Sequence, residues 1–265
     1  MSDAGVEPAS PKRPARRAGN RQTTAHAIVL RRRDFRESSR IVTVLTREHG
    51  KLTGLAKGAH RPDSPLLGRI DFLNELDATF TADRGGLRIL VRAKLLRERR
   101  ALRDPRRFVA AGHVAWLVDG ATHEGREEPL LYDLLQGGLN LLERCPHDKI
   151  AQIVLGLELR YLDALGALPD LERCCDCGEP FASRAFRQSD SLGLACREHA
   201  GLPRHPLHES ALELLQKLRT VPGRDWPSLH VEGGVRNAAP LPARWLAAAL
   251  EQRAPFRQLV FDAAS

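Results

Sequence analysis

The sequence has few aromatic residues and no long hydrophobic run. Phenylalanine, tryptophan and tyrosine make up 5% of its 265 residues, so we do not expect an extended surface for stacking bases. No segment approaches the roughly 18 consecutive apolar residues that a membrane-spanning helix needs. The N-terminus also lacks the apolar core of a secretory signal. We therefore expect a soluble, cytoplasmic protein with no membrane partner.

Several motifs of enzymes are also missing. The sequence has no Gly-x4-Gly-Lys-Ser/Thr phosphate loop, no Gly-x-Gly-x-x-Gly fingerprint and no His-Glu-x-x-His protease helix. It also lacks the Pro-Cys-x-x-Cys run of zinc deaminases. The acidic residues are scattered and suggest no acid–base pair. We therefore expect a binding protein with no catalytic residues.

The charge is distributed unevenly along the chain. The net charge is +8, and residues 23–104 contain 18 lysines and arginines against 10 acidic residues. Residues 105–265 contain 18 against 21. A basic block of this kind is typical of proteins that bind an anionic polymer such as nucleic acid, or an anionic membrane surface. An ordinary solvated surface is the alternative explanation.

The N-terminal third predicts a small barrel that follows a basic tail. Residues 1–22 are rich in proline, alanine and arginine, and we expect them to be disordered because they offer almost nothing to bury. Residues 23–100 contain about five short β-prone runs separated by glycine and proline. Phe72 and Phe80 alternate with polar residues and are expected in the core. Five strands in about 80 residues suit an OB-fold.

The pattern becomes helical after residue 101. Phe108, Val109 and Trp116 belong to a helix-spaced apolar set, and Pro129 is well placed to begin the next helix. A third segment, from Ile150 to Leu165, carries one apolar stripe and ends at Gly166. Two more helical segments lie near residues 208–220 and 241–253. The predicted class is α+β: a barrel, a helical domain of residues 101–172 and 203–265, and a small module of residues 173–202 inserted between them.

The inserted module contains four of the five cysteines. Its pattern is Cys174-x2-Cys177-x18-Cys196-x2-His199, two close pairs separated by a loop, as in zinc ribbons. Cys175 is the surplus thiol, because pairing it with Cys177 would leave only one residue between them. We expect one zinc ion per chain, and four protein ligands would make it structural, with no open position for substrate. A redox Cys-x-x-Cys or unliganded cysteines are the alternatives.

The basic block also carries features of a single-strand binding groove. Lys51, Lys57, His60 and Arg61 fall around glycines, where the backbone can approach a phosphate chain. The segment "ESSRIVTVLTREHGKLTGLAKGAHRPDSPL" resembles the N-terminal domain of the RecO family of bacterial DNA repair proteins. The helical middle and the segments "LPDLERCCDCGEPF" and "GLACREH" match the order of parts in that family. The resemblance covers roughly residues 24–255.

The resemblance implies an OB-fold and binding to both single- and double-stranded DNA. It also implies annealing of complementary strands, and loading of RecA onto strands coated by single-strand-binding protein (SSB). The implied partners are RecR, in many bacteria RecF, and the C-terminal tail of SSB; the implied location is the bacterial nucleoid. His199 stands where the family often has a fourth cysteine, and the N-terminal tail is an addition.

A cationic surface that holds two complementary strands would lower the repulsion between their phosphates without reading sequence. The residues expected to line that surface are Arg31, Arg33, Arg40, Lys51, Lys57 and Arg61. The main alternative function is a zinc-containing OB-fold protein that binds RNA or acts in translation, since its charge and fold would look the same.

Overall fold

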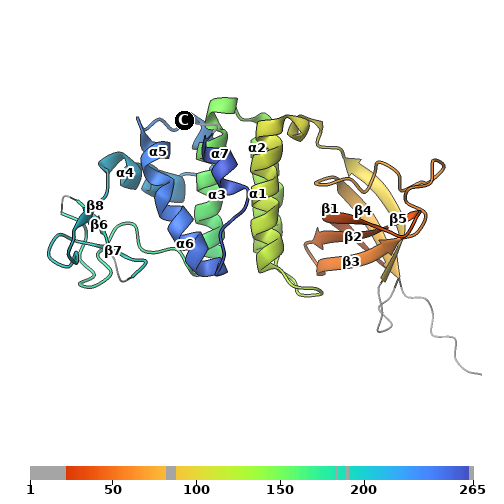
Figure 1. Cartoon of the computed structure of the whole chain (residues 1–265), viewed down its shortest axis with the longest axis horizontal. Helices are drawn as coiled ribbons and strands as arrows, with labels where there is room; N and C mark the ends of the chain where they lie inside the picture. The colour runs from red at the N-terminus through yellow and green to blue at the C-terminus, as the bar shows by residue number, and fades with distance from the viewer. Residues whose placement is uncertain (1–21, 82–87, 183, 189–190, 263–265) are drawn as a thin grey trace, which may run out of the picture.

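The computed structural model describes residues 22–81, 88–182, 184–188 and 191–262. The expected N-terminal tail lies outside these residues except for Gln22, which begins the first strand. A barrel occupies one end of the molecule, the helices form the middle, and the cysteine-rich module lies at the opposite end (Figure 1). No helix in the described part of the chain is both long and apolar enough to cross a membrane.

The N-terminal domain is a closed five-stranded barrel with the strand order β1-β2-β3-β5-β4. β3 and β5 pair in parallel, and the other neighbours pair antiparallel. This is the arrangement of an OB-fold, and it confirms the barrel that the sequence predicts. The strands are β1 (Gln22–Phe35), β2 (Ser39–Thr46), β3 (Gly50–Ala56), β4 (Glu75–Thr81) and β5 (Arg88–Arg97).

Strand β1 contributes to two hydrophobic cores. Ala27 and Val29 belong to the interior of the barrel, together with the fully buried Phe80. Ile28 and Leu30 belong to the core of the helical domain. Alternate residues of a strand point to opposite faces, so a run of consecutive buried residues here means that both faces of β1 are covered. The helical domain therefore packs directly on the barrel.

Seven α-helices follow the barrel in the described residues. Proline stands near the start of three of them, and Asp104 caps the first by accepting a hydrogen bond from the Arg107 backbone. The predicted helical segments are confirmed, whereas α5 and α7 are too short to show a helical period in the sequence. The helices are α1 (Pro105–Ala121), α2 (Pro129–Arg144), α3 (Ile150–Ala164), α4 (Glu209–Thr220), α5 (Gly234–Ala238), α6 (Pro240–Leu250) and α7 (Arg257–Asp262).

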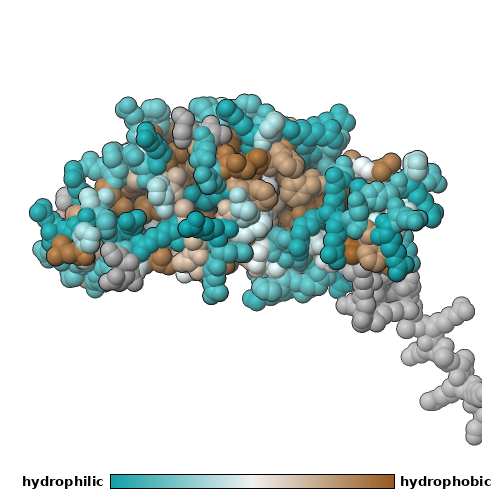
Figure 2. Space-filling view, viewed as in Figure 1, coloured by the Kyte–Doolittle hydropathy of each residue, from teal (hydrophilic) through white to brown (hydrophobic). Residues whose placement is uncertain are grey.

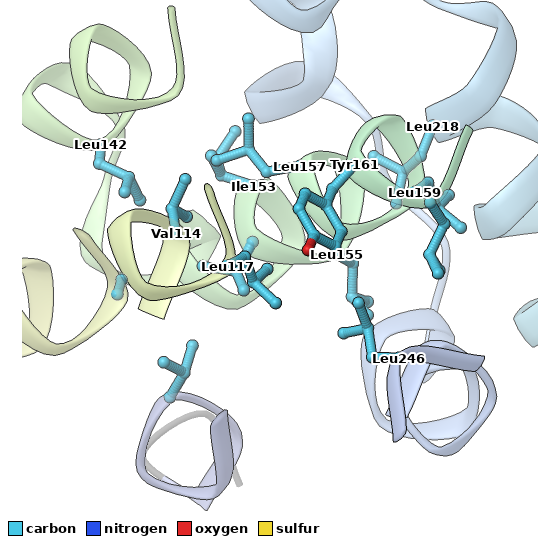
Figure 3. Close-up of a cluster of buried hydrophobic side chains, with 14 of the residues drawn as sticks. Val114, Leu117, Leu142, Ile153, Leu155, Leu157, Leu159, Tyr161, Leu218 and Leu246 are labelled. Atoms are coloured by element: carbon cyan, nitrogen blue, oxygen red, sulfur yellow. The ribbon is translucent and has the colours of Figure 1, made fainter. Parts of the chain in front are cut away.

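The third helix is the centre of the helical domain (Figure 3). The predicted single apolar stripe is too narrow, because all but three of the fifteen residues of α3 are buried. Helices α1, α2, α4 and α6 all contact α3. A helix surrounded in this way needs apolar residues on every side. Leu165, expected to end the stripe, lies after the helix and is exposed.

A buried carboxylate joins α3 to two other helices. Glu158 of α3 is fully buried, His113 Nε2 of α1 lies 2.8 Å from its Oε1, and Arg257 of α7 donates hydrogen bonds of 2.8 and 2.9 Å to its two oxygens. Burial by itself would raise the pKa of Glu158, but the charge of Arg257 and the hydrogen bond with His113 outweigh it and lower the pKa. The carboxylate is therefore ionised, and α1 and α7 are tied to α3 through it.

The cysteine-rich module is built on a small sheet with the strand order β7-β6-β8. Its strands are β6 (Phe186–Arg187), β7 (Leu194–Ala195) and β8 (His205–Pro206). Helix α6 holds it in place: Trp245 Nε1 donates to the Leu192 carbonyl at 2.9 Å, and Arg244 donates to the carbonyls of Gln188 and Ser191, both at 2.8 Å. The module is thus anchored to the helical domain.

The loop between α1 and α2 lies along β3. Thr53 donates from its backbone and its hydroxyl to the carboxylate of Glu124, at 2.9 and 3.0 Å, and the Gly125 backbone donates to the Lys51 carbonyl at 2.9 Å. Gly50, at the start of β3, has φ +62, and a β-carbon there would lie 1.7 Å from the Arg126 carbonyl oxygen. Only glycine fits this point of contact.

Replacing Gly50 by alanine should therefore destabilise the protein much more than the same change at Gly68. Gly68 also has a positive φ, +72, but a β-carbon there would meet nothing within 4 Å. Gly68→Ala should cost about 1 kcal/mol, the strain of the left-handed conformation, and Gly50→Ala on the order of 3 kcal/mol, because the Arg126 backbone must also move. Urea unfolding of both variants measures the difference. Equal unfolding midpoints for the two variants would show that the loop between α1 and α2 does not make the close contact with Gly50.

Candidate nucleic-acid interface and metal centre

Strand β1 carries a run of three arginines, Arg31–Arg33, next to hydroxyl and apolar side chains of β2 and β3. Arg31 pairs across the sheet with Thr43, and Arg33 pairs with Ile41. A cleft of about 630 Å³ opens over this face of the sheet, and none of the described residues that line it is acidic. Positive side chains and hydroxyls along a strand can bind a phosphate chain. The lining residues are Arg31, Arg32, Arg33, Ile41, Thr43, Thr53, Phe72 and Phe108.

Besides Arg31, three of the six predicted DNA-binding residues have exposed side chains. These are Arg33, which lines the cleft, and Lys57 and Arg61, which lie in the turn after β3. Gly58, with φ +68, makes this turn, and the Arg61 backbone donates to its carbonyl at 3.0 Å. Within the described residues none of the three basic side chains forms an ion pair.

Lys51 and Arg31 meet on one carboxylate of the helical domain. Lys51 is only 9% exposed, and its Nζ lies 2.8 Å from Asp119 Oδ1 and 2.6 Å from the Asp119 carbonyl oxygen. Arg31 Nε lies 2.9 Å from Asp119 Oδ2, but most of its side chain stays in solvent. Lys51 is therefore part of the junction between the barrel and α1, whereas Arg31 reaches both the junction and the cleft.

Arg40 is also held inside the barrel domain. Its Nε donates to Asp34 Oδ1 at 2.9 Å and to His60 Nε2 at 3.1 Å. Hydrogen bonds from Arg40 and His60 lower the pKa of Asp34. The Arg40 side chain is 17% exposed. This cluster fixes the turn after β3 near the end of β1 and leaves Arg40 little freedom to meet a ligand.

Two features of this surface were not predicted from the sequence. Arg32 lies in the same run and pairs with Asp71, and its place between two predicted residues could have indicated it. Phe108 was expected on the apolar side of a helix, but it is 49% exposed. It makes an edge-to-face contact with Phe72, with ring centroids 5.8 Å apart. Phe72 itself is only partly buried, whereas Phe80 is in the core as expected.

At the other end of the molecule, four side chains converge as the cysteine spacing indicates. One ligand atom from each of Cys174, Cys177, Cys196 and His199 lies within 4.8 Å of all the others, and Cys196 Sγ lies 3.1 Å from His199 Nδ1. Ligands on a tetrahedral zinc ion must be about this close, since zinc–sulfur bonds are about 2.3 Å long. These four residues can therefore hold a metal ion.

Backbone N–H groups stabilise two of these sulfurs as thiolates. Burial would raise the pKa of Cys174, but hydrogen bonds from the backbones of Cys177, Cys196 and Asp176 outweigh it and lower the pKa. A backbone hydrogen bond from His199 likewise lowers the pKa of Cys196. For Cys177, the effect of one backbone bond is outweighed by burial and the neighbouring thiols, which raise its pKa. A cation would relieve this crowding of negative charge, so the donor set fits a metal.

The fifth residue of the motif, Cys175, is outside the group. It pairs with the sheet through its backbone N–H, which donates to the Leu194 carbonyl at 2.9 Å. Burial, followed by the charges of Asp176 and Cys174, raises the pKa of its thiol. Gly193 lies so close that a β-carbon there would be 2.7 Å from the Cys175 side chain. Cys175 is thus turned toward β7 and away from the converging ligands.

The sequence of the chain matches two family models along most of its length. Residues 21–99 match "Recombination protein O N terminal", and residues 102–239 match "Recombination protein O C terminal". The chain belongs to the RecO family. It is 34% identical over 218 residues to the DNA repair protein RecO of Heliobacterium modesticaldum, covering 78% of this chain and 77% of that one. It is also 32% identical over 179 residues to the RecO of Bacillus subtilis, covering 66% and 67%.

Both candidate sites lie within the matched regions. The six predicted basic residues fall in the N-terminal RecO region, and the Cys3His group falls in the C-terminal one. The expected family is therefore confirmed. The cleft and the metal-binding group belong to the part of the chain that is similar to other RecO proteins.

Substituting single cysteines should separate ligands from the surplus thiol. Cys175→Ser should keep one zinc ion per chain, because Cys175 is not in the converging group. Cys174→Ser should lose the zinc and lower the melting temperature of the protein, since metal binding stabilises the fold of such modules. Zinc content by atomic emission and thermal unfolding are the measurements. The reverse result would mean that Cys175 and not Cys174 is the ligand.

Proposed function

We propose that this protein is a recombination mediator that binds single- and double-stranded DNA and anneals complementary strands. With RecR, and in many bacteria RecF, it would help to load RecA onto strands coated by SSB. It acts by binding and carries no catalytic site. The observation that carries the proposal is the closed barrel with an exposed cationic outer face, in a chain of the RecO family.

The physical basis is the neutralisation of phosphate charge. Two complementary strands repel each other through their backbones, and lysine or arginine contacts lower that repulsion while releasing counterions. Because such contacts do not read bases, binding is largely independent of sequence. Arg33, Lys57 and Arg61 are the strongest candidates for these contacts, because they are exposed and unpaired within the described residues. Arg31 is a weaker candidate because it is exposed but also pairs with Asp119. Arg40 and Lys51 mainly form contacts within the protein.

We propose that the Cys3His group holds one structural zinc ion per chain. Three sulfurs and one imidazole nitrogen are the ligands that zinc takes in closed structural sites. Such a shell has no free position for a substrate or a water molecule. The metal would therefore hold β6, β7 and the two Cys-x2 turns together.

The partners and location follow from family membership. We propose that the protein works in the bacterial cytoplasm at the nucleoid, and that it contacts RecR and the acidic C-terminal tail of SSB. We also propose the division into a basic tail (1–22), an OB-fold (23–100), a helical domain (101–172 and 203–265) and a zinc module (173–202).

Neutralising the exposed basic residues should weaken DNA binding in a way that salt dependence can identify. Arg33→Ala and Lys57→Ala should each lower affinity for oligonucleotides of any sequence and reduce the slope of log K against log salt by about one. Lys51→Met should instead lower the melting temperature, because it leaves Asp119 with one cation fewer. Fluorescence anisotropy at several salt concentrations measures the slopes. Unchanged slopes for both exposed variants would exclude these residues from the interface.

An annealing assay tests the function itself. The purified protein should speed annealing of complementary DNA strands that are coated by SSB, and it should bind matched DNA at least as well as RNA. Annealing is followed by the fluorescence change of a labelled strand. A rate equal to that without protein would contradict the proposed function. A clear preference for RNA would favour the alternative of an RNA-binding OB-fold protein.

A further inference from the structure

An exposed aromatic ring stands beside the arginine run, although the ring comes from a different domain. Phe108 belongs to the first turn of α1, whereas Arg31–Arg33 belong to β1 of the barrel. Its ring is half exposed and is supported from one side by Phe72 at a centroid distance of 5.8 Å. A phenylalanine held in this way keeps one part of its surface available to a flat partner.

Two clefts meet at this ring. The basic cleft over the barrel and a second cleft of about 410 Å³ beside α1 share Arg31, Phe72 and Phe108. The second cleft is mostly apolar, with Trp116 and Leu259 among its lining residues. Hydrophobic residues gather on the surface between the helices and the barrel, and hydrophilic residues border them (Figure 2). A ligand with a charged chain and flat apolar groups would be complementary to both clefts at once.

We propose that Phe108, supported by Phe72, stacks on a base of a single DNA strand whose phosphates lie along Arg31 and Arg33. The inference rests on the proposed function and deepens it, because it names the strand's path and a stacking residue outside the barrel. Combining a cationic groove with aromatic platforms is how proteins bind single strands without reading their sequence.

The order of the cationic residues along the barrel favours a polyanionic chain as the ligand. Arg31 and Arg33 are two residues apart on β1, roughly 7 Å along the strand. In the sheet, Arg33 lies opposite Ile41, which in turn lies opposite Leu55 near the end of β3. Lys57 follows directly after that end, and Arg61 lies four residues further on in the same turn region. The positive groups thus continue from Phe108 along the barrel, and a chain with repeated negative charges fits this path better than a short acidic peptide.

The strand must be single at this point. In a duplex the flat faces of the bases are covered by their neighbours in the stack, so none could lie on Phe108 without being unstacked. Arg31 and Arg32 already pair with Asp119 and Asp71, which limits what charge alone can contribute here. The aromatic contact would add affinity that does not depend on salt.

The decisive experiment compares binding of two oligonucleotides of equal length, one of dT and one of abasic sites. Phe108→Leu keeps an apolar contact with Phe72 but removes the stacking ring, and should weaken binding to dT by about fivefold or more while leaving abasic binding unchanged. Phe108→Trp should keep the affinity for dT, and its added tryptophan emission should be quenched by dT but not by the abasic strand. Leu202→Ala, an exposed apolar change in the cysteine-rich module, is the matched control and should alter neither.

The outcomes are distinguishable. If the wild-type protein binds neither strand, the proposed function fails. If the wild-type protein binds dT and the Phe108→Leu variant binds dT equally well, the stacking inference is wrong while the function stands. The same holds if the variant loses affinity for dT and for the abasic strand by the same factor. If Phe108→Leu abolishes binding of an acidic peptide ending in phenylalanine but not of dT, the cleft is a peptide site and the inference is overturned. Melting curves of the variants exclude unfolding as the cause, and the Phe108→Trp quenching gives an independent readout.

Discussion

The carboxylate of Asp119 determines where the helical domain meets the barrel. Lys51 and Arg31 both direct their charges at it, one buried and one largely in solvent. Removing one partner of a buried pair leaves a charge without compensation, which is costly, so α1 cannot slide along the barrel without losing these contacts. The same contact sets the position of Phe108, eleven residues earlier on α1, relative to the arginine run. The shape of the cleft thus depends on ion pairs that two of the predicted interface residues, Arg31 and Lys51, make with a helix of the other domain.

Packing fixes α1 relative to both the barrel and the other helices. Strand β1 faces the barrel interior on one side and the helical core on the other, so the two domains share one element. Within the helical domain, α1 is held to α3 by apolar contacts and by the His113–Glu158 hydrogen bond, and Arg257 brings α7 to the same carboxylate. A buried charge of this kind is stable only while its partners stay in place. The helical domain therefore presents α1 to the barrel as a rigid surface.

Features set by neighbours along the chain could be predicted from the sequence. Alternating strand residues, proline at helix starts and the two Cys-x2 pairs each reflect local geometry, and the structure agrees with them. Features that depend on contacts between distant segments could not. Nothing near Lys51 shows that Asp119, 68 residues later, would bury it. The residues around Phe108 in the sequence do not show that its ring would be half exposed beside Phe72 and the barrel. The residues around Glu158 do not show that its partners, His113 and Arg257, lie 45 and 99 residues away.

The barrel has few aromatic residues, and the fold shows where the aromatic rings near its cationic face come from. The barrel needs its one fully buried ring, Phe80, for its own core, and Gly54 leaves room for it, since a β-carbon there would lie 2.7 Å from that ring. In the proposed DNA complex a flat surface for bases would have to come from elsewhere, and α1 places Phe108 at the edge of the cationic face. The metal-binding group cannot serve this purpose, because it lies at the opposite end of the molecule (Figure 1). The group that can hold a metal ion and the proposed DNA-binding face thus lie at separate ends of the molecule. The helical domain connects them, because it anchors the cysteine-rich module and contributes Phe108 to the edge of the cationic face.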